Sequence, residues 1–233
     1  MADLSEWQQT LGTRFKDPSL LEQALVHSSF INENLGTATA SNERLEFLGD
    51  SVLGMVIAGE LYTRYPQHSE GEMTKMRSVL VRSGTLKSIA ESICLGDYIY
   101  LGKGEEASGG RHKMANLAGA MESLIAAVFL DQGLEAARDF ILRLFGAELD
   151  SLSNNSNLID YKSQLQQLYQ PRYKKTPVYR TIETAEVKRN RMFFSEVIID
   201  DKVMGSGYGR NKKNAETAAA RSALEQETED FTR

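Results

Sequence analysis

The sequence has few residues that would mark a secreted or membrane-spanning protein. Cys94 is its only cysteine, so no disulfide can form within the chain, which is typical of a reducing compartment. We expect Cys94 to be a small core residue. The first ten residues contain two acids and no apolar run, which predicts no secretory signal. The apolar stretch 117–130 is interrupted by Glu122 and is too short to span a bilayer. We therefore expect a cytoplasmic protein with no membrane partner.

The net charge of −5 is unevenly distributed along the 233 residues. Residues 1–158 hold 13 Lys and Arg against 21 Asp and Glu, a net charge of −8, whereas residues 159–224 hold 13 against 7, a net charge of +6. A chain of this length can form one large domain or two modest ones. The opposite signs favour two domains with different tasks, the basic one being a candidate for binding a polyanion.

The first part of the sequence has the apolar periodicity of helices almost throughout. Apolar residues recur at spacings of three and four in 18–28, 42–63, 72–92, 114–130 and 134–149. Asp17 before Pro18 is a helix start signal, and Ser69 with Glu72 forms a capping box. The glycine-rich, charged stretch 102–113 predicts a loop. We therefore expect an all-α domain over residues 1–149.

The second part changes in composition after a polar stretch, residues 150–157, that is typical of a linker. A helical stretch, 157–170, precedes three runs rich in β-branched and aromatic residues, 177–183, 192–200 and 202–210. An Ala-rich helix then begins at Asn211. The pattern predicts a small α+β domain over residues 158–226, of order α-β-β-β-α, with an acidic tail at 227–233.

Three acids lie close together in the apolar helix predicted over 42–63. At about 100° per residue, Glu43, Glu46 and Asp50 fall within a stripe of about 60° on one face. Ionised acids that converge in a partly buried site need a positive partner, and Mg²⁺ takes such oxygen ligands. The alternative is an ordinary exposed acidic face that pairs with Lys and Arg.

A fourth acid supports a metal site. Glu122 lies among apolar and small residues, where a carboxyl needs a partner or a shifted pKa. Gly54, Ala58 and Gly59 would let the helix of 42–63 approach the helix of 114–130 closely. We infer that these helices pack together and bring Glu122 beside Glu46 and Asp50. A cation held there could polarise a phosphodiester and activate a water.

The stretch NERLEFLGDSVL, residues 42–53, resembles the signature of the ribonuclease III family. EGEMTKMRSVLV, LGKGEEASGG and ESLIAAVFLD agree with the same family, and the second part resembles its double-stranded-RNA-binding domain. Together these stretches cover almost the whole chain. The resemblance implies a homodimeric endonuclease that cuts both strands of duplex RNA with Mg²⁺, for which Mn²⁺ can substitute, and that uses no nucleotide cofactor.

The resemblance also implies roles for individual residues. Glu46, Asp50 and Glu122 match the catalytic metal-ligand positions, and Glu43 and Glu70 match auxiliary acids near the cleft. Phe47 matches an aromatic residue that inserts into the partner subunit. The alternatives are that Phe47 is an ordinary core residue and that Glu70 merely favours the positive end of its helix.

Gly119 departs from the family pattern, which has a further metal-ligand Asp at this position. Glycine is unfavourable in a helix interior, so either close helix packing or a weakened metal site accounts for it. Since Mg²⁺ binds with one or two protein carboxylates plus water and phosphate, we expect an active nuclease that is slower or requires more metal than its relatives. We also expect Gly119→Asp to lower the Mg²⁺ concentration required for cleavage.

Lys212 and Lys213 open the last helix after a glycine-rich turn, where the helix dipole also favours phosphate. They resemble the phosphate-binding corner of the double-stranded-RNA-binding domain, and Gln164 matches a minor-groove position. Lys188 and Arg189 stand where relatives carry a different turn, and they could reach the RNA backbone. The alternative for these basic residues is a solvated surface.

These features predict a double-stranded-RNA endoribonuclease whose products carry 5′-phosphates and 3′-hydroxyls. By resemblance, its substrates include ribosomal RNA precursors and structured messenger RNA. Two alternatives remain: a non-catalytic or weakly active RNA-binding protein whose site has decayed at Gly119, and a metal-dependent phosphohydrolase that acts on nucleotides. Cleavage of a hairpin with Mg²⁺ would distinguish them.

Overall fold

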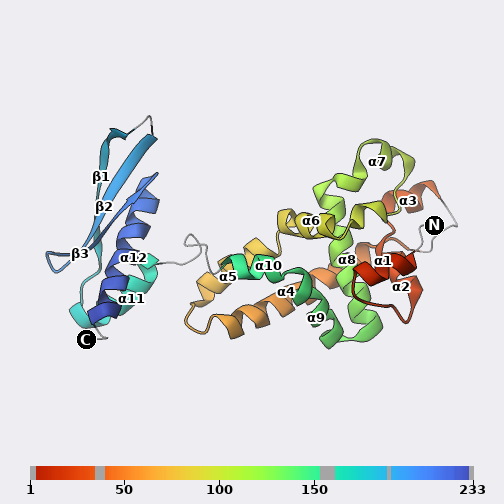
Figure 1. The fold of residues 1–233 in the computed structure, drawn as a ribbon, viewed down its shortest axis with the longest axis horizontal. Coiled ribbons are helices and arrows are strands. Elements are labelled where there is room, and N and C mark those ends of the chain that lie inside the picture. The colour runs from red at the N-terminus through yellow and green to blue at the C-terminus, as the bar shows by residue number, and fades with distance from the viewer. Residues whose placement is uncertain (1–3, 35–39, 153–160, 188–189, 231–233) are drawn as a thin grey trace. The chain divides into compact units, whose positions relative to one another are not determined.

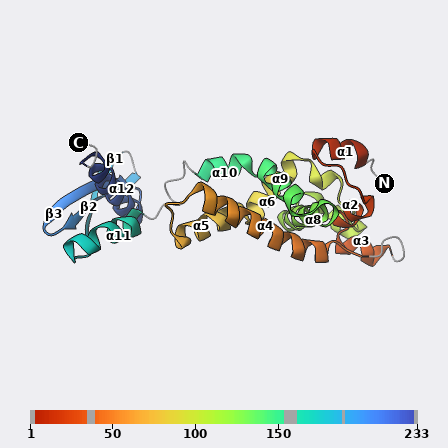
Figure 2. The ribbon, with the colours of Figure 1, turned by 90° about the horizontal axis from the view of Figure 1, so that it is seen from below.

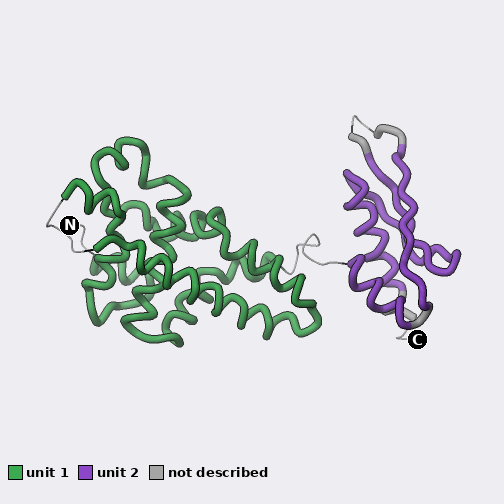
Figure 3. The backbone as a smooth tube through the Cα atoms, turned by 180° about the vertical axis from the view of Figure 1, so that it is seen from behind, with its two compact units in different colours: residues 1–158 green, residues 159–233 purple. Residues whose placement is uncertain are grey.

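The computed structural model divides the chain into two compact units, residues 1–158 and 159–233 (Figure 3). It describes residues 4–34, 40–152, 161–187 and 190–230. The first unit is helical and the second combines helices with a sheet, which confirms the expected fold class (Figure 1).

The first unit consists of α-helices and two short 3-10 helices within the described residues. They are α1 (Leu4–Thr10), α2 (Pro18–Ala24), α3 (Ser28–Glu33), α4 (Glu43–Arg64), α5 (Glu70–Leu80), α6 (Ser83–Ser92), η1 (Leu95–Asp97), α7 (Lys103–Ala107), η2 (Gly110–His112), α8 (Met114–Gln132), α9 (Leu134–Leu144) and α10 (Gly146–Leu152).

Helix α8 is the centre of this unit. Helices α2, α4, α6 and α9 all pack against it, and Figure 2 shows α8 nearly end-on among its neighbours. By length and composition alone, α8 could cross a membrane, and it is longer than the apolar stretch recognised in the sequence. However, 61% of its most apolar window is buried within the fold, as expected of a core helix. The buried position of α8 fixes the location of Glu122.

Local signals explain where several helices begin and end. Asp17 caps α2, and the Ser69–Glu72 capping box at the start of α5 is present. The periodicity of 72–92 spans two helices, because Arg82 is extended and the Thr85 hydroxyl donates to the Val79 carbonyl at 2.7 Å.

Four other expectations for this unit were wrong. The range 134–149 is divided between α9 and α10, which both bury apolar residues in one core. The helix expected over 18–28 ends at Ala24, and only Ser28 belongs to α3. The predicted loop at 102–113 contains the short helix α7. Cys94 is exposed, because it lies in a left-handed turn (φ 54°) before η1.

The second unit is a three-stranded antiparallel sheet with two helices. It contains α11 (Tyr161–Tyr173), β1 (Val178–Val187), β2 (Asn190–Ile199), β3 (Lys202–Gly209) and α12 (Lys212–Asp230), with strand order β1-β2-β3. Every second residue of the β3 stretch Gly205–Gly209 is a glycine that faces α12. A methyl group on Gly209 would lie 2.3 Å from the Ala215 nitrogen, so the sheet and helix pack almost backbone to backbone.

The helices extend beyond two expected boundaries. Helix α10 continues to Leu152, into the expected linker 150–157, because Leu149 and Leu152 are buried. Helix α12 continues to Asp230, into the expected acidic tail, and Asn211 caps its start by accepting the Asn214 N–H at 2.8 Å.

Candidate active site and RNA-binding surface

Helices α4 and α8, which carry Glu46, Asp50 and Glu122, approach each other closely. A methyl group on Gly49 would lie 1.8 Å from the Glu122 carbonyl oxygen, so only glycine permits this approach. The predicted pairing of the two helices is confirmed, but the residues credited with it were wrong. Gly54 and Gly59 have nothing within 4 Å of an added methyl group.

A buried hydrogen-bond bridge fixes the two helices beside the acids. The Ser123 hydroxyl donates to the carbonyls of Asn42 at 3.1 Å and Gly119 at 2.8 Å. The Asn42 carbonyl also accepts the backbone N–H of Glu46 at 2.9 Å. The first turn of α4 is therefore tied to the turn of α8 that precedes Glu122.

The structure brings Glu43, Glu46, Asp50 and Glu122 into one electrostatic cluster. Burial, followed by the charges of Asp50 and Glu46, raises the pKa of Glu122 to about 7. Burial and the charge of Glu43 also raise the pKa of Glu46, while His27 acts in the opposite direction. Within the described residues, no ion pair joins Glu46, Asp50 or Glu122 to a cationic side chain. The charge of His27 opposes the repulsion among these carboxylates only in part, because the pKa of Glu46 is still raised.

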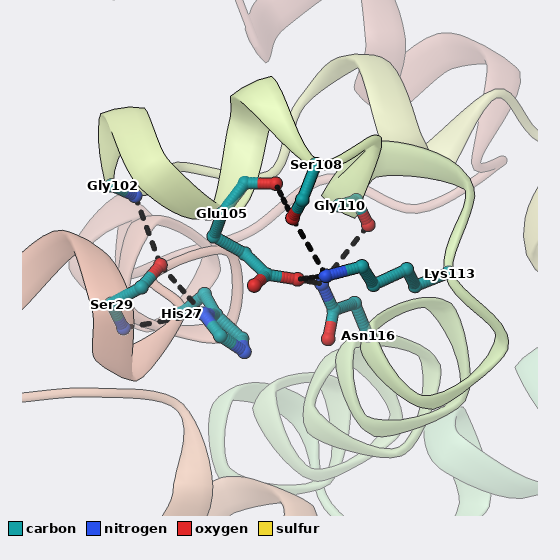
Figure 4. Close-up of polar contacts among 8 residues, drawn as sticks. All are labelled: His27, Ser29, Gly102, Glu105, Ser108, Gly110, Lys113 and Asn116. Atoms are coloured by element: carbon teal, nitrogen blue, oxygen red, sulfur yellow. Dashed lines mark hydrogen bonds and ion pairs between the residues drawn. The ribbon is translucent and has the colours of Figure 1, made fainter.

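A neighbouring acid in the same unit shows the opposite behaviour (Figure 4). Glu105 accepts hydrogen bonds from Lys113 Nζ and Asn116 Nδ2, each at 2.8 Å. These two bonds lower the pKa of Glu105. Glu105 thus has a cationic partner that stabilises its charged form, whereas Glu46 and Glu122 form no ion pair with a described Lys or Arg.

His27 lies within electrostatic range of both Glu105 and the cluster, since its charge lowers the pKa of Glu105 and opposes the rise in the pKa of Glu46. Its Nδ1 accepts the Ser29 N–H at 3.2 Å, and the Ser29 hydroxyl accepts the Gly102 N–H at 2.9 Å (Figure 4). The sequence reasoning missed His27 and Glu105. The only available signal was the rarity of histidine, with three in the chain.

The donor chemistry of the cluster fits a hard divalent cation. It offers carboxylate oxygens whose mutual repulsion a cation would relieve. As the side chains stand, no three or more His, Cys, Asp or Glu side chains in the described ranges are arranged to hold a metal ion. Binding would therefore require the carboxylates to change rotamer, which the exposed side chain of Asp50 can do without disturbing the core.

Glu70 lies apart from this cluster in the same chain, whereas Phe47 lies one helical turn from both Glu43 and Asp50 on α4. Glu70, the first residue of α5, accepts a hydrogen bond from the Thr74 hydroxyl at 3.0 Å. It lines a groove beside Tyr62, which is about 24 Å along α4 from Glu46. Phe47 is 79% exposed, so its alternative interpretation as a core residue is wrong.

The second unit presents exposed basic residues at the start of α12. Lys212 and Lys213 are exposed, and neither forms an ion pair with a described residue. Lys162 and Lys175, in contrast, pair with Glu216 and Asp200. Gln164 is half-buried on α11. Lys188 and Arg189 lie outside the described residues.

The family models match both units. Residues 17–149 match the model described as ribonuclease-III-like, and residues 161–227 match the double-stranded RNA binding motif. Fold and site therefore define a two-domain ribonuclease, in which a helical nuclease domain is followed by an RNA-binding domain.

Relatives and solved structures agree with these matches. Ribonuclease 3 of Dehalococcoides mccartyi strain 195 is 50% identical over 232 residues, covering 100% of this chain and 98% of the relative. Ribonuclease 3 of Roseiflexus sp. strain RS-1 is 45% identical, covering 95% and 94%. A crystal structure of the ribonuclease III nuclease domain from Campylobacter jejuni is 38% identical with a TM-score of 0.58, covering 64% of this chain and 97% of that one. The chain belongs to the ribonuclease III family and is an endoribonuclease specific for double-stranded RNA.

Proposed function

We propose that this endoribonuclease is a cytoplasmic, Mg²⁺-dependent homodimer in which Glu46, Asp50 and Glu122 hold the catalytic cation. The observation that supports this most strongly is the partly buried cluster of carboxylates, in which burial, followed by the charges of Asp50 and Glu46, raises the pKa of Glu122 to about 7. By resemblance to the family, the products carry 5′-phosphates and 3′-hydroxyls. Ribosomal RNA precursors and structured messenger RNA are the expected substrates.

Each carboxylate has a separate task in this proposal. Glu122 lies on the buried helix α8, so the packing of the core fixes its backbone. The hydrogen bonds from the Ser123 hydroxyl and the Glu46 N–H to the Asn42 carbonyl hold Glu46 beside α8. Asp50 and Glu43 are exposed and face the solvent from which RNA arrives. When bound, magnesium would supply positive charge to polarise the scissile phosphate and activate a water.

An exposed stripe on α4 supports dimer formation. Phe47, Met55 and Tyr62 are 79%, 51% and 74% exposed and lie within about 80° on one face of the helix. Gly54, on the same face, leaves open space for another backbone. Exposed apolar surface of this kind marks an interface. A second structure of the Campylobacter jejuni nuclease domain, 39% identical with a TM-score of 0.57 and covering 61% of this chain and 95% of that one, is described as flexible in the region involved in dimer formation.

The groove between α4 and α5 is the site that we assign to Phe47 of a second copy. It has a volume of about 280 Å³ and is lined by Ala58, Leu61, Tyr62, Glu70, Met73, Thr74 and Arg77. A two-fold axis near Gly54 would place each Phe47 over the groove of the other subunit, as a symmetric interface requires. Glu70, on the groove wall, would then face the acidic cluster of the partner subunit.

In the second unit, we assign phosphate contacts to Lys212 and Lys213 and a minor-groove contact to Gln164. The two lysines are exposed at the start of a 19-residue helix, where free N–H groups and the dipole also attract phosphate. Duplex RNA is recognised largely through such backbone contacts. Lys188 and Arg189 remain candidates for the same surface.

Cleavage of a defined RNA hairpin, titrated with Mg²⁺ and compared with free nucleotides as substrates, tests the proposal. We expect metal-dependent cleavage of the hairpin and no hydrolysis of nucleotides. RNA binding without cleavage at any Mg²⁺ concentration would favour the non-catalytic alternative. That alternative is disfavoured by the cluster, because a binding protein has no physical need for clustered, partly buried acids.

A further inference from the structure

The side chain of His27 is held in one orientation at the start of α3. Its Nδ1 accepts the Ser29 N–H at 3.2 Å and so caps the helix. The Ser29 hydroxyl lies 2.8 Å from the same nitrogen and itself accepts the Gly102 N–H, which leaves its own proton to be donated to Nδ1. A neutral His27 therefore carries its proton on Nε2, and an imidazolium carries one there as well. In either state Nε2 is a hydrogen-bond donor.

The backbone around His27 is fixed on both sides. The His27 N–H donates to the Tyr100 carbonyl at 3.1 Å, which ties it to the segment before α7. The carbonyl of Val26 accepts the Asn42 N–H at 2.8 Å, which ties the same segment to the residue before α4. The imidazole is thus positioned by the backbone that also begins the helix of Glu46.

The Nε2 atom of His27 points away from this support. Figure 4 shows it on the edge of the ring opposite Ser29, with no partner among the residues drawn. It forms no hydrogen bond with any described residue, and solvent reaches it. The Glu105 carboxylate is bonded to Lys113 and Asn116 instead, and Glu46 interacts with the imidazole only through charge. A positioned donor beside the acidic cluster is therefore free to bind a ligand.

We propose that His27 binds RNA, with its Nε2–H donating to a non-bridging phosphate oxygen of the strand that is cut. The inference rests on the proposed metal site, which fixes where that strand lies. A phosphate brought beside Glu46 and Asp50 is repelled by their charges, and a donor at this place offsets part of the repulsion. Histidine suits the position better than lysine, because a lysine is charged at neutral pH and would pair with the carboxylates that the cation needs.

Two substitutions of His27 separate RNA binding from the capping of α3. Asparagine caps helices well, so His27→Asn keeps an acceptor for the Ser29 N–H but has no donor in the place of Nε2. For cleavage of a defined hairpin, kcat/KM should fall by about tenfold or more, as expected for loss of one hydrogen bond to a charged group. The Tm should stay within about 1 °C of the wild type. His27→Ala should lose as much kcat/KM and also about 2–4 °C in Tm, because the cap is lost.

His112→Asn is the matched control. It replaces an exposed histidine of the same unit and should change neither kcat/KM nor Tm.

A series of hairpins, each with one methylphosphonate near the scissile bond, tests the contact directly. A methylphosphonate removes the charge and one acceptor oxygen of a single phosphate. At the phosphate that His27 contacts, it should lower kcat/KM of the wild type by about tenfold more than that of His27→Asn. At all other positions the two proteins should be affected equally. A purely structural role of His27 would produce no such position.

Wild-type kcat/KM in His27→Asn would overturn the inference, as would equal methylphosphonate effects in both proteins at every position. Mn²⁺ affinity of the metal-free protein, measured by electron paramagnetic resonance of the free ion, should change less than about twofold in His27→Asn. A loss of affinity as large as the loss of kcat/KM would also overturn it, because His27 would then support Glu46 and not the RNA.

Glu122→Gln distinguishes these failures from failure of the metal site. If Glu122→Gln cleaves as fast as the wild type, the proposed metal site is wrong, and the inference fails with it. If Glu122→Gln is inactive while His27→Asn cleaves as fast as the wild type, only the role of His27 is wrong.

Discussion

The two units carry opposite charge, and in both some of the charged residues that we propose to be functional form no ion pair with a described residue. In the nuclease unit, Glu60 pairs with Arg64, and Glu105 with Lys113, whereas Glu122 has no cationic partner among the described residues. In the RNA-binding unit, Lys162 and Lys175 are paired, whereas Lys212 and Lys213 are not, again among the described residues. Net charge thus indicates which unit binds a polyanion, and the lack of an ion pair supports the roles proposed for Glu122, Lys212 and Lys213.

The energetic consequences differ between the units. Lys212 and Lys213 are exposed, so an unpaired charge there is solvated and has little effect on folding. Glu46 and Glu122 are half-buried, so their unpaired charges disfavour the folded state until a cation arrives. The nuclease unit should therefore respond to metal and pH, and the RNA-binding unit to salt.

The largest expected effect comes from removing the charge of Glu122. Glu122→Gln should lower the cleavage rate by about 10³-fold or more, because several kcal/mol of transition-state stabilisation depend on the bound cation. RNA affinity, measured by filter binding in Ca²⁺, should change less than about twofold. Glu91→Gln, which removes an exposed acid paired with Lys87, is the control and should retain full activity. Substantial cleavage by Glu122→Gln would remove Glu122 from the catalytic centre.

The next largest effect is on assembly of the nuclease unit. Phe47→Ala should weaken the dimer by about 30-fold or more, because aromatic anchors in pockets dominate interface energies at about 2 kcal/mol or more each. Sedimentation equilibrium measures the change. Tyr208→Ala removes an aromatic residue of similar exposure, 63%, from the second unit and should leave the mass unchanged. A dimer of undiminished affinity in Phe47→Ala would exclude the proposed interface.

Much of the architecture follows from sequence because it is local. Periodicity and composition predicted the α4 and α8 helices and the α-β-β-β-α order. Ser69 and Glu72 predicted the start of α5, since a capping box lies within four residues. These features require no knowledge of distant partners.

The features missed by sequence reasoning depend on contacts between distant residues. Gly49 was not recognised as the point of helix contact, because nothing near it in sequence indicates that the Glu122 carbonyl lies against it. Glu105 looked like part of a charged loop until the fold brought Asn116 to it. The break at Arg82 was invisible because the apolar periodicity continues across it into the same core.

The third prediction concerns the salt dependence of the RNA-binding unit. Replacing both Lys212 and Lys213 by Ala should weaken binding of duplex RNA by about tenfold and reduce the magnitude of the salt slope by about 2, since each lysine releases about one counterion. Fluorescence anisotropy across a KCl series measures both quantities. Lys175→Ala, whose lysine is already paired with Asp200, should leave the slope unchanged. Equal slopes in the double variant and the wild type would contradict the assignment.

The smallest effect, the pH dependence of the metal-free nuclease unit, tests the origin of the contrast between the units. Because the folded protein raises the pKa of Glu122 from 4.5 to about 7, it binds more protons than the unfolded chain between these values, and stability falls as pH rises through this window. Glu122→Gln removes the ionisation. In chelator, its Tm should therefore exceed that of the wild type by about 2 °C at pH 8, a modest difference because solvent screens a half-buried carboxylate. The difference should fade as the pH approaches 4.5. Mn²⁺ affinity should also weaken as the pH falls from about 7 to 4.5, since the ion competes with the proton on Glu122. A Tm difference that is constant from pH 5 to pH 8 would show that folding does not raise the pKa of Glu122. The contrast between a nuclease unit that is destabilised by its unpaired carboxylates and an RNA-binding unit whose unpaired lysines are solvated would then be wrong.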